Sequence, residues 1–211
     1  MKVVLIGPGD IEKHSRILNR DLGELEEELR KIGKTLAELN VELVLLPDRG
    51  MSYLVAKYYK TNGGKKVYGT IPLSDKEFGI KHLESYRDVI DEEIDTKDWF
   101  RQDLMHCLFG HCILCLGFSL GSIGELSYAY YLYKLFKGKK PEVRVESLKR
   151  LHPDIVAGEI EPYPVIIYKP FVAGPLQYEL KQYIEDVGGR VVYVSNVDGL
   201  KQELENLRLS K

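Results

Sequence analysis

The sequence predicts an α/β protein built on a doubly wound, mostly parallel β-sheet with helices on both faces. Short apolar runs rich in β-branched residues alternate with segments of helical composition, and turns containing glycine or proline separate them. Parallel strands need crossover connections, and right-handed crossovers fold such a sheet into the doubly wound form. No repeat, low-complexity tract or linker interrupts the alternation, so we expect a single domain over residues 1–211.

The expected strands are recognised by their apolar, β-branched composition. In chain order they are Lys2–Ile6, Val41–Leu46, Lys66–Ile71, the short acidic run Asp88–Glu92, Cys112–Leu116, Val165–Tyr168 and Arg190–Val194. Several of them end at glycine- or proline-containing turns, which is typical of strands that feed a crossover helix.

Helical periodicity is clearest between Ile17 and Leu39, where leucine and isoleucine recur at three- and four-residue steps with Glu and Lys between them. This spacing predicts one amphipathic helix. Further helices are expected at Met51–Lys60, Thr96–Leu108, Glu125–Phe136, Leu176–Val187 and Val197–Leu207. Thr96 is the expected N-cap of its helix, with Asp98 in the first turn. Residues 139–164 are charged and proline-punctuated, and we expect an irregular excursion with one short helix.

Composition argues against several classes of partner and location. Thirty Lys and Arg against 32 Asp and Glu give a formal net charge of −2, so no basic field exists to attract nucleic acid. No stretch approaches membrane-spanning length, and the first residues lack the pattern of a signal peptide. With only three cysteines a secreted disulfide framework is not expected. We therefore expect a cytoplasmic protein without a nucleic-acid or membrane partner.

The expected ligand site lies beyond the carboxyl ends of the strands, where open α/β sheets bind their ligands. Three turns have this position, at Gly7–Asp10, Pro47–Gly50 and Gly117–Glu125. Each precedes a helix whose first N–H groups lack intrahelical partners and, with the helix dipole, favour an anion such as phosphate. The candidate phosphate-binding residues are Gly7, Gly9, Asp10, Gly50, Gly121 and Ser122.

The turn Gly117–Glu125 carries the strongest signal of the three. Glycine allows the backbone to approach phosphate oxygens closely, and Ser122 adds a hydroxyl donor. Glu125 at the helix start is able to accept a bond from a ribose hydroxyl, or to stabilise or attack a positively charged ribosyl carbon. A tight turn with Ser122 as an ordinary helix cap, and Glu125 as a helix-start residue, is the alternative.

Several short motifs resemble those of the LOG phosphoribohydrolases, which belong to the SLOG group of Rossmann-like nucleotide-binding domains. Gly121-Ser122-x-x-Glu125 is similar to the second half of the PGGxGTxxE motif of that family, and Arg101-Gln102-x-x-Met105 resembles its RKxxM segment. Lys65–Pro72 looks like the family's third strand. The order and approximate spacing of these elements agree over most of the chain.

The resemblance implies a Rossmann-like fold, a nucleoside monophosphate in the crevice and a homodimer. It also implies that Arg101 and Glu125 are catalytic residues that cleave an N-glycosidic bond, without a cofactor. An Arg supplies a planar, permanently charged donor fork, and a Glu opposes the positive charge of an oxocarbenium-like transition state, so this pairing is chemically coherent.

Other interpretations remain open beside hydrolysis. Phe118, Ser119 and Pro47 stand where the LOG family has glycines or a glycine-flanked turn, which favours a non-catalytic nucleotide sensor or carrier. Gly121–Ala129 also resembles the GTAxELGYA segment of nucleoside 2-deoxyribosyltransferases, whose Glu is the nucleophile, and Asp103 fits that comparison loosely. An interaction protein that has lost its ligand is the third alternative.

Four further features are interpreted as structural. His106, Cys107, His111, Cys112 and Cys115 form a cluster with one iron–sulfur-like spacing, but a fourth cysteine is missing, so no metal site is expected. The tyrosines between Tyr128 and Tyr133 are expected on a dimer interface or a sheet face. His14 is expected to be exposed on a helix, and Asp48 with Arg49 to form a turn with a local ion pair.

Overall fold

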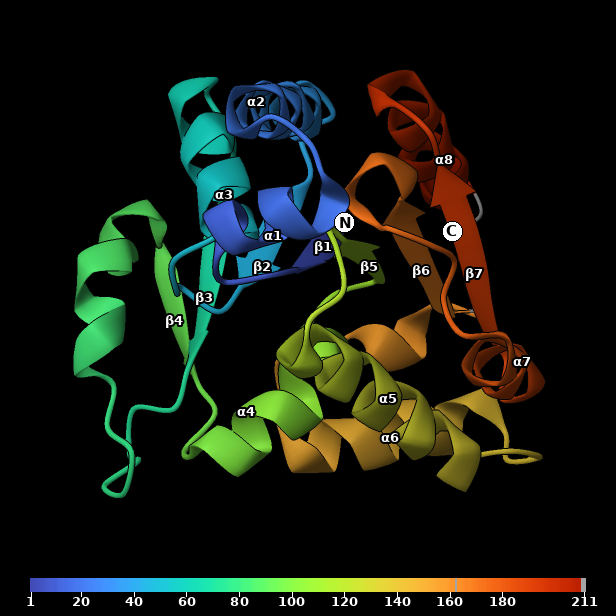
Figure 1. Ribbon diagram of the computed structural model, residues 1–211. Helices are drawn as coiled ribbons and strands as arrows, with labels where there is room; N and C mark the ends of the chain where they lie inside the picture. The colour runs from blue at the N-terminus through green and yellow to red at the C-terminus, as the bar shows by residue number, and fades with distance from the viewer. Residues whose placement is uncertain (162, 210–211) are drawn as a thin grey trace.

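The computed structural model describes residues 1–161 and 163–209. Its centre is a seven-stranded sheet in the order β4-β3-β2-β1-β5-β6-β7, and every neighbouring pair of strands is parallel (Figure 1). The strands are β1 (Lys2–Ile6), β2 (Glu42–Leu45), β3 (Val67–Ile71), β4 (Glu92–Asp95), β5 (Cys112–Cys115), β6 (Tyr163–Tyr168) and β7 (Gly189–Val194). The predicted doubly wound α/β fold is therefore confirmed.

Helices cover both faces of this sheet. The α-helices are α1 (Ile11–Leu18), α2 (Leu22–Glu38), α3 (Met51–Thr61), α4 (Trp99–Met105), α5 (Leu120–Leu135), α6 (Pro141–Leu151), α7 (Tyr178–Asp186) and α8 (Val197–Leu209). Short 3₁₀ helices lie at η1 (Lys81–Val89), η2 (His106–Phe109), η3 (Ala157–Glu159) and η4 (Lys169–Phe171). Helices α2, α3 and α8 lie on one side of the sheet and α4 to α7 on the other (Figure 1).

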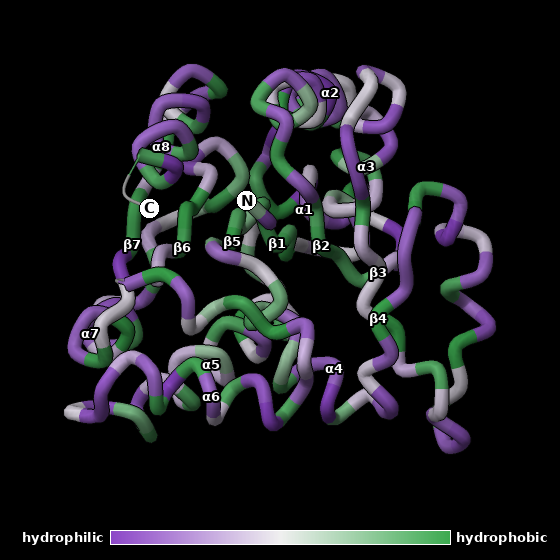
Figure 2. The backbone as a smooth tube through the Cα atoms, turned by 180° about the vertical axis from the view of Figure 1, so that it is seen from behind, coloured by the Kyte–Doolittle hydropathy of each residue, from purple (hydrophilic) through white to green (hydrophobic). Residues whose placement is uncertain are grey.

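The core lies between these layers. Strands β3, β5 and β6 are buried along their whole length, as expected for parallel strands covered on both faces. The edge strand β4 exposes Glu92 and Glu93, charges that oppose pairing with another chain. Figure 2 shows hydrophobic residues concentrated along the central strands and hydrophilic ones on the outer turns of the helices.

The direction of winding reverses at β1. From β1 the chain adds β2, β3 and β4 toward one edge of the sheet, then crosses back to place β5 on the other side of β1. Val3 is accordingly in register with Leu43 on one side and with Cys112 on the other. The carboxyl ends of β1 and β5 thus flank the topological switch point, where doubly wound sheets bind ligands.

The predicted helix between Ile17 and Leu39 is wrong in one respect: two helices replace it. Asn19 adopts a left-handed conformation with φ of 50° and ends α1, and its N–H donates to carbonyls of the last turn. Asp21 then caps α2 by accepting the N–H of Glu24 at 3.1 Å. The chain turns here because Asn tolerates the left-handed region and Asp is a strong N-cap.

Three other boundaries differ from the prediction. The fourth strand lies at Glu92–Asp95, not Asp88–Glu92, because residues up to Val89 form the 3₁₀ helix η1. Asp98, not Thr96, caps α4 by accepting the N–H of Arg101 at 2.9 Å. Helix α5 begins at Leu120, so the turn after β5 is short and Gly121 and Ser122 lie in the first helical turn.

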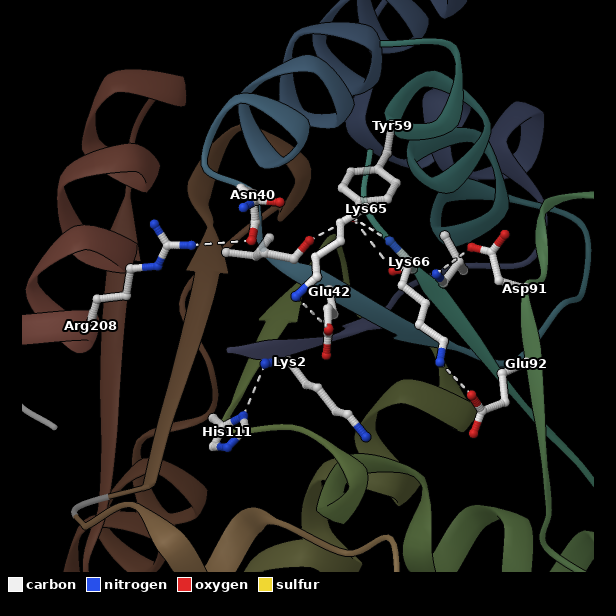
Figure 3. Close-up of polar contacts among 12 residues, drawn as sticks. Lys2, Asn40, Glu42, Tyr59, Lys65, Lys66, Asp91, Glu92, His111 and Arg208 are labelled. Atoms are coloured by element: carbon white, nitrogen blue, oxygen red, sulfur yellow. Dashed lines mark hydrogen bonds and ion pairs between the residues drawn. The ribbon is translucent and has the colours of Figure 1, made fainter. Parts of the chain in front are cut away.

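The amino ends of the strands are closed by polar contacts (Figure 3). The ammonium of Lys65 lies 3.0 Å from the Glu42 carboxylate, and Lys66 pairs with Glu92. The N–H of Lys2 donates to Nδ1 of His111 at 2.9 Å.

In the part of the chain that the structure describes, every helix is too short or too polar to cross a bilayer. Residues 139–164, expected to be irregular with one short helix, contain α6 and the single 3₁₀ turn η3 before β6.

Candidate functional site

A cavity of about 190 Å³ opens at the switch point between β1 and β5. It is lined by residues from the loops after β1, β2 and β5 and from the starts of α3 and α5, with α4 and η2 closing one side. The lining residues are Leu5, Ile6, Gly7, Pro8, Gly9, Leu46, Asp48, Arg49, Ser52, Asp103, His106, Ser119, Gly121, Ser122 and Glu125.

The loops meet here because glycine allows close backbone contact. Gly50 has φ of 110° and ψ of −156°, and a Cβ atom there would lie 2.4 Å from the carbonyl oxygen of Pro8. The N–H of Met51 donates to that same oxygen at 3.1 Å. A Cβ atom on Gly7 would lie 3.1 Å from Cβ of Leu116. Gly50 lies behind the cavity wall, so it shapes the site without lining it.

The start of α5 presents backbone donors to the cavity. Ser119 caps the helix by accepting the N–H of Ser122 at 3.2 Å, and the Ser122 hydroxyl accepts the N–H of Ser119 at 2.7 Å. The alternative with Ser122 as the N-cap is therefore corrected: Ser119 is the cap and Ser122 closes a capping box. Within the described residues, the N–H groups of Leu120 and Gly121 have no hydrogen-bond partner, which leaves them for an anion.

Arg49 lines the same cavity as Gly121. It is exposed at the cavity and is the one Lys or Arg among the lining residues. The expected local ion pair with Asp48 does not form: Asp48 instead accepts the backbone N–H of Arg49 at 2.7 Å, and the guanidinium has no ion pair among residues 1–161 and 163–209. The Arg49 side chain is thus available for a negatively charged ligand.

Glu125 contributes a buried carboxyl group to the cavity lining. Its side chain is 8% exposed, and within the described residues it has no hydrogen bond or ion pair. Burial raises its pKa to about 8, and the nearby Asp103 carboxylate contributes to the rise. Partial desolvation also raises the pKa of Asp103. At neutral pH Glu125 is mostly protonated, so it is a hydrogen-bond donor that faces the cavity.

A chain of buried hydrogen bonds holds α4 and η2 against the strand ends. The Thr96 hydroxyl donates to Oε1 of Gln102 at 2.9 Å, and Nε2 of Gln102 donates to Oγ1 of Thr70 at 3.0 Å. Oγ1 of Thr70 lies 2.8 Å from Nδ1 of His106, whose Nε2 lies 3.3 Å from the carbonyl oxygen of Leu5. Burial lowers the pKa of His106 to about 4, so the ring is neutral.

The predicted site residues divide into two groups. Gly7, Gly9, Gly121, Ser122 and Glu125 line the cavity together. The remaining three lie around it.

Arg101 lies on the outside of α4, with its side chain 60% exposed and 3.5 Å from the Asp98 carboxylate, and it does not line the cavity. Asp10 caps α1 by accepting the N–H of Lys13 at 2.8 Å, and this bond holds its pKa below the usual range. Gly50 supports the loop after β1, as described above.

Ser52 and His106 line the cavity although no sequence pattern indicated a ligand-binding role for them. The signal available for Ser52 was its place two residues after Gly50, in the first turn of α3. His106 had no such signal, because its position depends on how η2 packs against β1.

His14 is buried, not exposed as expected, and its Nε2 lies 2.8 Å from the carbonyl oxygen of Phe171. It therefore joins α1 to the segment after β6.

The cysteines and the tyrosines of α5 lie outside the cavity lining. Cys107, Cys112 and Cys115 are buried as free thiols, and the described residues contain no group of three or more potential ligands suited to a metal ion. Tyr130 and Tyr133 are buried, with Tyr133 stacked on Tyr163 at a centroid distance of 5.4 Å. These two tyrosines pack against Tyr163 of β6.

Comparison with solved structures identifies proteins that share this α/β fold over nearly their whole length. The molybdenum cofactor carrier protein of Chlamydomonas reinhardtii is 17% identical, with a TM-score of 0.57, over 100% of this chain and 98% of its own. The molybdenum cofactor binding protein of the phototrophic bacterium Rippkaea orientalis is 14% identical, with a TM-score of 0.62, over 98% of this chain and 96% of its own. TM1055 is 18% identical, with a TM-score of 0.63, over 97% and 98%.

These neighbours share the seven-stranded parallel α/β arrangement over nearly their whole length, so the Rossmann-like fold expected from the sequence is confirmed. At these identities the likeness extends to the fold. No family model matches the sequence, and no curated protein matches it.

Proposed function

We propose that the protein binds and carries a phosphorylated heterocyclic ligand, either a nucleotide or a molybdenum-cofactor-like pterin, in the cavity between β1 and β5. The observation that carries the proposal is the convergence of an unpaired arginine, Arg49, with the free N–H groups at the start of α5. Together these donors fit a phosphate group, because the guanidinium supplies charge and the helix start supplies directed hydrogen bonds.

The cavity fits the anionic end of such a ligand. A volume of about 190 Å³ is below the roughly 300–1,000 Å³ of sites that enclose a whole drug-sized ligand. Phosphate and part of a sugar or pterin side chain would fill it, with the rest of the molecule projecting through the open side. Carboxyl, hydroxyl and guanidinium groups line the cavity and thiols do not, so the protein would hold the organic part of a molybdenum cofactor as cargo.

Two solved neighbours described as binding or carrying the molybdenum cofactor support the carrier role over catalysis. The position of Arg101 supports it as well, because its exposed side chain pairs with Asp98 outside the cavity lining.

Calorimetric titration with inorganic phosphate, ribose 5-phosphate, AMP and GMP tests the nucleotide branch. The cofactor branch is tested by incubation with molybdenum cofactor released anaerobically from a molybdenum enzyme, followed by gel filtration and molybdenum analysis. We expect binding without turnover. Failure of every one of these ligands to bind would refute the proposal.

Two exposed arginines form a matched pair for locating the site. Arg49→Ala is expected to weaken binding about tenfold or more, since it removes charge-assisted hydrogen bonds, whereas Arg101→Ala is expected to stay within about twofold of the unmodified protein. The reverse result would place the ligand beside α4, as the LOG resemblance implies, and would contradict the site proposed here.

Hydrolysis of an N-glycosidic bond is the second candidate function, and the buried Glu125 carboxyl favours it. Because its pKa is raised to about 8, Glu125 is protonated at neutral pH and fits a general acid that donates to the departing base. Asp103, on the same cavity, supplies a second carboxyl group. If Glu125 is the acid, the protein should release free base from AMP, and Glu125→Gln should abolish this release. The rate of release should fall as pH rises through about 8. Undiminished release by Glu125→Gln would exclude Glu125 as the acid.

Self-association and cytoplasmic location stay predictions. Light scattering tests the expected homodimer, and a monomer at all concentrations would contradict it.

A further inference from the structure

A groove of about 440 Å³ lies between α5 and α7, which are next to each other in both views of the chain (Figures 1 and 2). One wall of this α5–α7 groove is formed between Ser127 and Lys137, and the other between Leu180 and Val187. Among the residues that the structure describes, none lines both this groove and the cavity between β1 and β5. The volume of the groove falls within the roughly 300–1,000 Å³ that is usual for small-molecule sites.

The buried part of the groove lining is held in place by the sheet. Tyr130 and Ile184 are almost fully buried. The Tyr130 hydroxyl donates to the carbonyl oxygen of Tyr163 on β6 at 3.2 Å. Gly189 at the start of β7 packs against both side chains, since a Cβ atom there would overlap the Tyr130 ring and lie 2.6 Å from Cγ2 of Ile184. The groove therefore has a preformed apolar floor, which lowers the cost of ordering it around a ligand.

Two aromatic side chains flank this floor from opposite walls and face solvent. Tyr131 on α5 is 56% exposed, and Tyr183 on α7 is 68% exposed. Neither hydroxyl forms a hydrogen bond within residues 1–161 and 163–209. Exposed aromatic rings around one concave site are characteristic of a surface that an apolar group covers. The two tyrosines are therefore placed to contact a flat ring between the helices.

Two lysines give the same groove a positive rim. Lys134 in the last turn of α5 and Lys137 just beyond it are exposed, and neither ammonium forms an ion pair in the described part of the chain. Among the described lining residues Asp186 is the one carboxylate, so the lining keeps one net positive charge. Free ammonium groups beside exposed aromatic rings match a ligand that joins a flat apolar ring to a carboxylate.

We propose that the α5–α7 groove binds a small organic anion composed of a planar apolar ring and a carboxylate. Tyr131 and Tyr183 contact the ring, and Lys134 and Lys137 face the carboxylate. This site is separate from the phosphate cavity, and its occupation does not depend on the function proposed above. Helix α5 contributes to both sites, its first turn to the cavity and its later turns to the groove.

The test uses two probes with the same ring and opposite charges, 1-naphthoate and 1-naphthylmethylamine. Calorimetry measures the binding of each probe to the unmodified protein. We expect 1-naphthoate to bind at least tenfold more tightly than the amine, because two ammonium groups and one carboxylate line the groove.

Matched pairs of variants locate the site. Tyr183→Ala should weaken 1-naphthoate binding about fivefold to tenfold, whereas Tyr178→Ala, which removes a side chain that is 70% exposed on α7 outside the groove, should stay within about twofold. Lys134→Glu should weaken 1-naphthoate binding about tenfold and favour the amine, whereas Lys139→Glu, outside the groove, should change neither. All four side chains are exposed, so the fold should be kept, and circular dichroism checks this.

Other outcomes would overturn the groove site. Absence of 1-naphthoate binding, equal affinities for the two probes, or equal effects of Tyr183→Ala and Tyr178→Ala would each do so. Loss of 1-naphthoate binding in Arg49→Ala would assign the probe to the phosphate cavity. A dimer that dissociates in Tyr183→Ala, in a protein that does not bind 1-naphthoate, would assign the groove to a contact between copies of the chain. Binding of 1-naphthoate without any binding of phosphate ligands would instead contradict the proposed function and leave the groove site standing.

Discussion

Substitution of Gly50 by alanine should both destabilise the fold and displace one wall of the cavity. Gly50 has φ of 110° and ψ of −156°, a region of backbone conformation that is essentially restricted to glycine and costs other residues about 1–3 kcal/mol. The new Cβ atom would also lie 2.4 Å from the Pro8 carbonyl oxygen and 2.5 Å from Cα of Gly9. Ordinary contact is about 3.4 Å or more, so the loop after β1 must move by about 1 Å.

Forced repacking of this kind costs about 1–3 kcal/mol, which together with the backbone strain gives a loss of about 4 kcal/mol in the free energy of unfolding. For a chain of 211 residues, each kcal/mol lowers the melting temperature by about 2–4 °C. Thermal unfolding followed by circular dichroism should therefore show a fall of about 10 °C. Phosphate-ligand affinity should fall as well, because Pro8 and Gly9 line the cavity.

Gly63→Ala is the matched control for this prediction. Gly63 also has a positive φ, 77°, but a Cβ atom there would meet nothing within 4 Å. It should lose about 1 kcal/mol from backbone strain alone and keep full ligand affinity. Equal losses in the two variants, or a Gly50→Ala variant as stable as the unmodified protein, would refute the argument from close approach of the loops.

Three further predictions concern the carboxyl group, the buried polar chain and the domain organisation. Because the folded state raises the pKa of Glu125 from 4.5 to about 8, the unmodified protein should lose stability relative to Glu125→Gln as pH rises between these values, by an amount on the order of 5 kcal/mol, with no further change above pH 8. Urea denaturation of both proteins from pH 4 to 9 measures the difference, and parallel curves would show that the carboxyl is not desolvated. Gln102→Leu should cost about 1–3 kcal/mol, since it leaves the buried Thr96 hydroxyl without its acceptor and removes the amide that donates to Thr70. Phe100→Ala on the exposed side of α4 should stay within about 0.5 kcal/mol, and similar stability of the two variants would contradict a structural role for Gln102. The single domain predicted for residues 1–211 should unfold in one transition. The unfolding curve followed by the fluorescence of the sole tryptophan, Trp99, should coincide with the curve followed by far-ultraviolet circular dichroism, and two separated transitions would refute the single domain.

The central strands could be predicted because they are buried on both faces, and strands buried in this way are continuous apolar, β-branched runs in the sequence. The acidic edge strand β4 is the exception: its exposed residues Glu92 and Glu93 carry no apolar signal, and its position was misplaced by several residues. Periodicity also concealed the break between α1 and α2. Apolar residues continue at helical spacing through Asn19 and Asp21, so the periodicity hides the left-handed cap at Asn19 and the N-cap at Asp21.

The location of the candidate site could be predicted from topology, because the turns after β1 and β5 meet where a parallel sheet reverses its winding. The properties of its side chains did not follow. Arg49 is unpaired in the loop after β2, whereas Arg101 on α4 lies 3.5 Å from the Asp98 carboxylate, and the raised pKa of Glu125 depends on burial by elements distant in sequence. Local motifs specify residue types, whereas charge state and availability come from tertiary contacts.

The chain of hydrogen bonds from Thr96 through Gln102, Thr70 and His106 to Leu5 runs in one direction from donor to acceptor. A backbone carbonyl can only accept, so Nε2 of His106 must carry the ring proton, and Nδ1 must then accept from the Thr70 hydroxyl. Thr70 in turn receives the Gln102 amide, whose oxygen receives the Thr96 hydroxyl. Every donor in this chain points from the edge of the sheet toward β1. A second proton on His106 would force the Thr70 hydroxyl to turn away from Nδ1 and to donate only to the carbonyl oxygen of Leu45, 3.4 Å away. The neutral tautomer with the proton on Nε2 therefore matches the chain of hydrogen bonds that joins α4 and β3 to β1.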